Sequence, residues 1–186
     1  MRRFFQIARL PDEELPLLEG ALLIAREEYP RLDVRGCVRE VEELADSLGP
    51  RPDLRRLNRY FFQELRFRGN EADYYDPKNS YLNEVLARRI GIPITLATLY
   101  VEIARRAGLR ACGIGFPGHY LARCGRTIVD CFHARVLDRR GCRDLLQTVT
   151  EGRVKFSPAL LAPSGPRSTL VRMLDNLKTA YLRRGE

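Results

Sequence analysis

A long apolar run in the middle of the chain constrains the fold more than any other feature. Residues 93–107 are typical of one helix whose few polar side chains form a single narrow stripe. A helix that is apolar nearly all round is usually buried at the centre of a domain. Pro93 suits its first turn, where the missing N–H costs no hydrogen bond, and Gly108 ends it.

The segment after this helix differs because its polarity alternates with a period near two. Short strands are predicted over residues 110–116, 119–124 and 127–132, with a fourth extended piece over 133–137. Gly125-Arg126 is typical of a two-residue hairpin loop. Together these patterns predict an α+β fold in which a buried central helix packs on a small antiparallel sheet.

The flanking segments are predicted to be helical. Residues 1–68 hold three amphipathic stripes, and Ser80 is the expected N-cap of a further helix that Gly91 ends. A last helix is expected from about Ser168, with an apolar stripe formed by Leu170, Leu174, Leu177 and Tyr181. That stripe must dock on the body of the protein or pair with a second copy, so a homodimer through this helix is one expectation.

Three segments are therefore predicted along the chain. Residues 1–69 form an N-terminal helical subdomain, residues 70–162 form the α+β core, and residues 163–186 form a linker and a C-terminal amphipathic helix.

Composition narrows the function classes. The chain carries 32 basic and 24 acidic residues, a net charge of +8, but the arginines are interleaved with acids rather than gathered on one stretch. Nucleic acid is therefore the weakest of the partner hypotheses. No apolar run could cross a membrane and no signal sequence forms, so a cytoplasmic protein without a membrane partner is expected. The 5 irregularly spaced cysteines indicate free thiols.

Four ordered motifs in the middle of the chain carry a family resemblance. They are Tyr75-Asp76-Pro77-Lys78-Asn79-Ser80-Tyr81-Leu82-Asn83, Arg89-Ile90-Gly91-Ile92-Pro93-Ile94-Thr95-Leu96, Phe116-Pro117-Gly118-His119 and Ile128-Val129-Asp130. In this order the motifs resemble the bacterial SirB family of transglutaminase-like proteins. Members of that family continue into a helical-repeat region, so the resemblance implies that this chain is a short or truncated form.

The resemblance also implies a mechanism. In the transglutaminase and papain-like superfamily, a cysteine at the start of the buried helix attacks an acyl group. A histidine activates this cysteine, and an aspartate orients the histidine. Matching the motifs places His119 and Asp130 in the last two roles. Pro93 falls where the cysteine would stand, so the nucleophile is expected to be missing. Cleft-lining positions implied with it are Thr95, Asn79 and Asn83.

The predicted hairpin register tests whether these residues can meet. A two-residue loop at Gly125-Arg126 pairs Cys124 with Thr127 and makes Asp130 the diagonal neighbour of His119 on one face. Cys131 then points to the other face. A metal site from Cys124, Cys131 and His133 lacks a fourth ligand, so neither a metal nor another cofactor is expected.

Two functions from different classes follow. The first is a non-catalytic transglutaminase-like domain that binds a protein or peptide in the remnant cleft. The alternative is a hydrolase or acyl transferase that uses the His119/Asp130 pair with an unorthodox nucleophile, such as Thr95 or a water. A purely structural hydrogen bond between His119 and Asp130 is a third possibility, which would lock the hairpin without any ligand.

Overall fold

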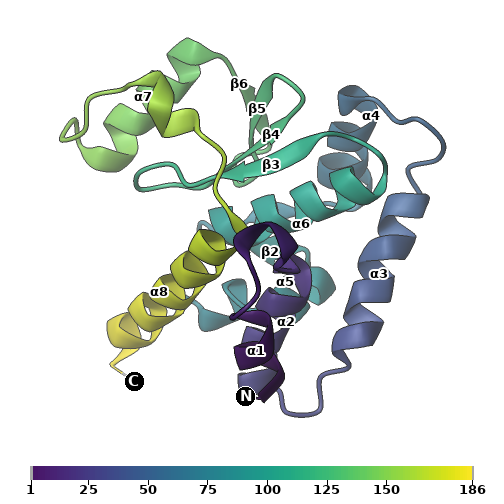
Figure 1. Cartoon of the computed structure of the whole chain (residues 1–186). Helices are drawn as coiled ribbons and strands as arrows, with labels where there is room; N and C mark the ends of the chain where they lie inside the picture. The colour runs from purple at the N-terminus through teal and green to yellow at the C-terminus, as the bar shows by residue number, and fades with distance from the viewer. Residues whose placement is uncertain (1, 186) are drawn as a thin grey trace.

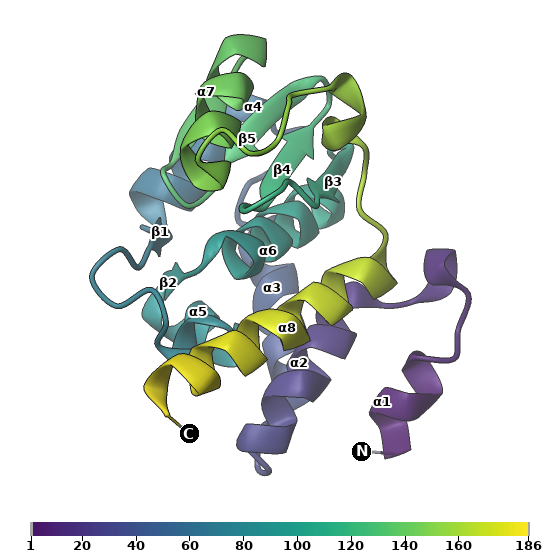
Figure 2. The same cartoon turned by 90° about the vertical axis from the view of Figure 1, so that its left-hand side faces the viewer.

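The sheet and the helix beneath it organise the molecule. The computed structural model describes residues 2–185. Four antiparallel strands lie in the order β3-β4-β5-β6, with α6 under one face and α7 over the other (Figures 1 and 2). The fold class is therefore α+β. The strands are β3 (Ala111–Ile114), β4 (Leu121–Cys124), β5 (Thr127–Asp130) and β6 (Arg135–Leu137).

Helix α6 (Pro93–Arg106) is the predicted central helix, and its burial is confirmed. Every residue from Pro93 to Ala104 is buried. Its side chains share one core cluster with residues of the N-terminal helices, of β4 and β5, and of the last helix. Because this cluster draws on all three predicted segments, α6 packs against most of the molecule.

The N-terminal part is helical, as predicted, but its third stripe is not one regular helix. After a short α-helical part, the chain continues as a π-helix in which the N–H of Leu65 donates to the carbonyl of Tyr60 at 2.8 Å. The elements are α1 (Arg2–Ile7), η1 (Asp12–Glu14), α2 (Leu17–Glu28), α3 (Val34–Asp46), α4 (Leu54–Asn58) and η2 (Arg59–Glu64).

The segment between η2 and α6 corrects two expectations. Ser80 is not an N-cap, because α5 (Leu82–Arg88) begins after Tyr81, and Asp76 instead caps the short helix η3 (Pro77–Asn79). Gly91 does not end α5 but belongs to a parallel two-residue pair, β1 (Arg68–Gly69) with β2 (Ile90–Gly91). Strands this short carry no periodic signal in the sequence.

Helix α7 (Arg139–Thr150) was not predicted. Asp138 caps its N-terminus by accepting the N–H of Gly141 at 2.7 Å. Its apolar side, with Cys142, Leu145 and Leu146, covers the sheet face opposite α6 and forms a second, smaller core cluster. The short helix η4 (Pro158–Leu161) then leads toward the last helix.

The C-terminal helix α8 (Pro166–Arg184) docks on the body of the protein. It packs along α2 (Figure 2), where a Cβ added at Gly20 would lie 2.8 Å from Leu170. The prediction is wrong for one residue of the apolar stripe, because Leu174 is 43% exposed and Met173 is buried instead. Pairing of this helix with a second copy stays a prediction. No helix among residues 2–185 is long and apolar enough to cross a membrane.

Candidate functional site

The β4–β5 hairpin brings the candidate residues together. Its loop is Gly125-Arg126, as predicted, and Cys124 pairs with Thr127. Gly125 has a φ of 58°, which glycine adopts at little cost. His119 lies just before β4 and Asp130 is the last residue of β5. The predicted strand 127–132 therefore ends two residues early, and residues 131–134 form a turn that leads into β6.

His119 and Asp130 are in contact. His119 Nε2 lies 2.9 Å from Asp130 Oδ1, and the two residues are 6% and 0% exposed. The predicted proximity of this pair is confirmed, although a catalytic role is a separate question. Since Nε2 faces the carboxylate, Nδ1 is the ring nitrogen of His119 that is left for a ligand.

Two further groups converge on the same carboxylate. His133 Nδ1 lies 2.7 Å from Asp130 Oδ2, and Arg135 Nε donates to that oxygen at 3.2 Å. Burial alone would raise the pKa of the Asp130 carboxyl. Hydrogen bonds and charge from His119 and His133 outweigh burial and lower that pKa well below its usual range. Asp130 is thus a buried anion held by three basic side chains.

Sequence reasoning missed the part that His133 plays in this cluster. Its ring stacks on that of His119, with centroids 5.7 Å apart and planes 19° from parallel. Phe132 meets both imidazoles edge-on, and Tyr74 meets Phe132 in turn at 5.8 Å. The sequence signal for this role of His133 was its spacing of three residues from Asp130, which a tight turn converts into a contact.

Arg172 of α8 binds the backbone of the loop that carries His119. Its guanidinium donates to the carbonyls of Phe116 and His119 at 2.9 and 2.7 Å. Burial lowers the pKa of this guanidinium. The last helix therefore fixes the loop that presents His119, a link between residues more than fifty positions apart.

Short contacts connect the site with the entrance to α6. The N–H of Gly69 donates to the carbonyl of Phe132 at 3.2 Å, and a Cβ at Gly69 would lie 2.6 Å from the Phe132 ring. Gly69 pairs with Gly91, two residues before Pro93. The first residue of α6 is that buried proline, with no side-chain nucleophile. Direct contact between His119 and Pro93 stays a prediction.

The hydroxyl of Thr95 is committed to local structure. The hydroxyl donates to the carbonyl of Asn79 at 2.8 Å and accepts a hydrogen bond from the N–H of Ile92 at 3.2 Å. Thr95 is also fully buried. These bonds tie the start of α6 to η3, so this residue is poorly placed to act as a nucleophile.

The two asparagines proposed to line a cleft differ. Asn79 is fully buried, and its amide N–H groups donate to the carbonyls of Asp73 and Tyr74, which fixes the loop beside Phe132. Asn83 lies in the first turn of α5 with a buried Oδ1 that has no hydrogen-bond partner among residues 2–185. A role for either in binding stays a prediction.

The cysteines nearest the site are turned away from it. Cys131 is completely buried and belongs to the core cluster around α6. Burial, together with the charge of Asp130, raises the pKa of its thiol well above the usual value. A thiol of this kind is not a ready nucleophile. Cys142 lies on α7 and is buried in the other cluster, between that helix and the sheet.

One group of side chains within the described part of the chain could hold a metal ion. It consists of His119, Asp130 and His133, whose ligand atoms all lie within 4.8 Å of one another, and not of the cysteines considered from sequence. Two imidazoles and a carboxylate suit zinc or iron(II). Both carboxylate oxygens already accept hydrogen bonds, and Arg135 places a fixed positive charge on one of them. A cation would have to displace these contacts.

The comparisons with known proteins agree with this architecture. Residues 31–175 match the transglutaminase-like superfamily, so the chain belongs to that superfamily. A UPF0162 protein of Xylella fastidiosa is 43% identical over 94% of this chain and 68% of its own length. The UPF0162 protein PA3419 of Pseudomonas aeruginosa is 31% identical over 95% of this chain and 69% of its own length.

A eukaryotic protein shares part of the same region. Human F-box only protein 21 is 36% identical over 69% of this chain, which corresponds to 22% of its own length. No solved structure gives a significant match to the chain.

Proposed function

We propose that this chain is a non-catalytic transglutaminase-like domain of the SirB type that binds a protein or peptide segment at the His119–Asp130 cleft. The observation that carries the proposal is the pairing of an organised His119–Asp130 contact at 2.9 Å with a proline as the first residue of the central helix. The histidine and the aspartate that would support a nucleophile are present, but a proline stands at the position proposed for the nucleophile. Free cysteines throughout the described residues fit a reducing compartment, so we place this role in the cytoplasm.

The electrostatics of the cluster favour binding over chemistry. A buried carboxylate costs free energy unless it is well paired, and Asp130 has three basic partners. Asp130 in turn holds the imidazole of His119 in one orientation, with Nδ1 directed away from the carboxylate. A fixed hydrogen-bonding group beside the Phe132 ring can recognise a backbone amide or a polar side chain.

A turnover assay tests the absence of thiol chemistry. The full chain is incubated with a glutamine-containing peptide and a fluorescent primary amine, with and without iodoacetamide. We expect no turnover that iodoacetamide abolishes, because the proposed nucleophile position is Pro93 and Cys131 is buried. Turnover that depends on a free thiol would contradict a non-catalytic domain.

A selection experiment tests binding. Peptides selected from a displayed random library on the full chain are titrated against the wild type, His119→Gln and Glu42→Gln, an exposed control on α3. We expect His119→Gln to weaken binding about tenfold, since it replaces the imidazole that Asp130 orients with a flexible amide, and the control to leave it unchanged. Peptides that bind all three proteins equally would place the binding site elsewhere.

A further inference from the structure

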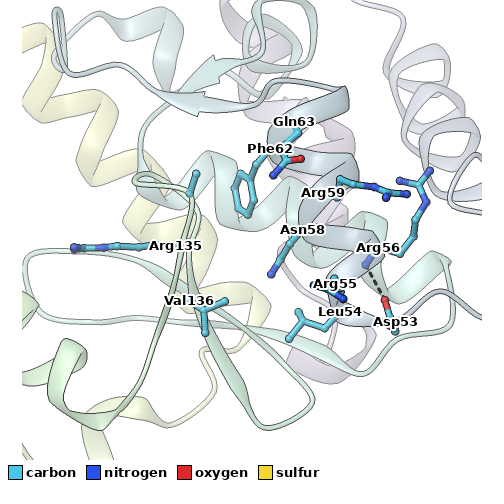
Figure 3. A pocket seen from close by; sticks show the side chains of 11 residues that line it. Asp53, Leu54, Arg55, Arg56, Asn58, Arg59, Phe62, Gln63, Arg135 and Val136 are labelled. Carbon is cyan, nitrogen blue, oxygen red and sulfur yellow. Dashed lines mark hydrogen bonds between the residues drawn. The ribbon is translucent and has the colours of Figure 1, made fainter.

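A groove that neither His119 nor Asp130 lines runs along the last strand of the sheet. It encloses about 660 Å³ between β6 and the segment formed by α4 and η2 (Figure 3). Ala134, Arg135 and Val136 form the strand side of the groove. The side chain of Arg135 points away from the groove (Figure 3). Its Nε donates to Asp130, so the groove and the polar cluster around Asp130 lie on opposite sides of this residue.

The strand side of the groove is an open sheet edge. β6 pairs with β5 on one side only, and no other hydrogen bond reaches its backbone among residues 2–185. Val136 is 54% exposed although its partner across the ladder, Val129, is fully buried. Unpaired N–H and C=O groups beside an exposed apolar side chain are the groups to which an added strand binds.

The opposite wall is rich in arginine. Arg55, Arg56 and Arg59 line it together with one acidic residue, Asp53, whose carboxylate accepts the N–H of Arg56. Glu64 pairs with both Arg56 and Arg59. Arg55 is exposed and has no acidic partner among the described residues. The wall therefore keeps a positive charge available to a partner.

The floor of the groove offers both apolar and polar contacts. Phe62 projects into it from η2, facing Val136 (Figure 3). Asn58 Oδ1 accepts the hydroxyl of Tyr100 at 2.6 Å, so its Nδ2 is the atom left to donate toward a ligand. The π-helical turn that carries Phe62 is a geometry found often at functional sites.

We propose that this groove binds an extended acidic peptide segment, which adds to the sheet as a strand beside β6. Successive side chains of a strand point to opposite faces, so acidic residues at every second position would all face Arg55 and its neighbours. The three residues of β6 match a segment of roughly 10 Å, at about 3.3 Å per residue. This site does not depend on the proposed role of His119.

The test uses three capped octapeptides and amide chemical shifts of the full chain. The probe alternates Thr and Glu, the second peptide replaces Glu with Lys, and the third keeps Glu but carries N-methylated backbone amides. We expect the first to shift the amides of residues 135–137 and 54–64. The lysine peptide should leave them in place, and the methylated peptide should bind more weakly because it cannot pair with the strand.

Variants separate this groove from other surfaces. Arg55→Glu should weaken binding of the Thr-Glu peptide about fivefold or more, and Arg140→Glu, on the exposed side of α7, should leave it unchanged. Absence of shifts, equal binding of the lysine or methylated peptide, or full binding by Arg55→Glu would each overturn the proposal.

Discussion

The two edges of the four-stranded sheet are treated differently by the rest of the chain. At the β3 edge, the N–H of Ser164 donates to the carbonyl of Gly113 at 2.9 Å, and Arg105 Nε donates to that of Ala111 at 2.8 Å. At the β6 edge no comparable bond exists among residues 2–185, and Val136 is 54% exposed. One edge is closed by the chain itself, and the other is open to a partner.

The open edge is nevertheless fixed in place from within. Arg135, the first residue of β6, donates to Asp130, the last residue of β5, so the buried polar cluster anchors the turn between these strands. The cluster around Asp130 therefore has a structural effect whatever it binds. An edge that is open but rigid suits recognition of a strand better than a flexible one, because less entropy is lost on binding.

Removal of the anchor should have the largest effect. Asp130→Ala would leave His119 buried without its partner, and we expect the free energy of unfolding to fall by about 3 kcal/mol or more. Urea unfolding measures the change. Asp144→Ala, an exposed residue of α7 whose carboxylate lies 3.9 Å from Arg140, is the control and should change stability by less than about 0.5 kcal/mol. If both variants lowered the free energy of unfolding by a similar amount, Asp130 would not be the anchor of this edge.

The same interaction predicts how stability depends on pH. The pKa of Asp130 is lower in the folded protein than in the unfolded chain, where it is about 3.9. Its contribution is therefore complete above that unfolded value and is lost as the pH falls through the lower folded pKa. Unfolding of the wild type and of Asp130→Asn should be compared between about pH 5 and pH 2.5. The difference in stability should narrow with acid; a constant difference would contradict the ionised cluster.

A smaller effect is expected at the closed edge. A Cβ at Gly113 would clash with the hydroxyl of Tyr120, which bonds to Thr169 at 2.8 Å. Gly113→Ala should therefore destabilise the protein by about 1–3 kcal/mol and speed hydrogen exchange of the Ser164 amide. At Gly115 the nearest atoms are 3.6 Å from an added Cβ, so Gly115→Ala is the matched control. Equal effects of the two changes would mean that Tyr120 does not limit the space beside position 113.

The smallest effect on stability is expected at the open edge. Val136→Lys replaces an exposed side chain and should change the free energy of unfolding by no more than about 0.5 kcal/mol. Hydrogen exchange should be faster for outward-facing amides of β6 than for the Ser164 amide, which is bonded to Gly113. A loss of more than about 2 kcal/mol in Val136→Lys would show that the side chain is buried against something, and that the edge is not open.

Periodicity and turn chemistry by themselves determined the central helix and the β4–β5 hairpin. The apolar run from Pro93 must be buried whatever surrounds it, and the Gly125-Arg126 loop sets the pairing of the strands beside it. That pairing was enough to predict the contact between His119 and Asp130, because side chains on a pleated strand alternate with a fixed period. Local rules suffice where the backbone geometry is regular.

Only the tertiary structure decided what completes the site and what lies beside it. His133 and Arg135 reach Asp130 because the chain turns sharply after β5. Arg172 binds the carbonyl of His119 from α8, a helix that lies far from His119 in the sequence. The groove exists because a π-helical segment more than seventy residues away lies across from β6. Contacts between distant segments depend on how amphipathic faces pack together, and no local period in the sequence specifies that choice.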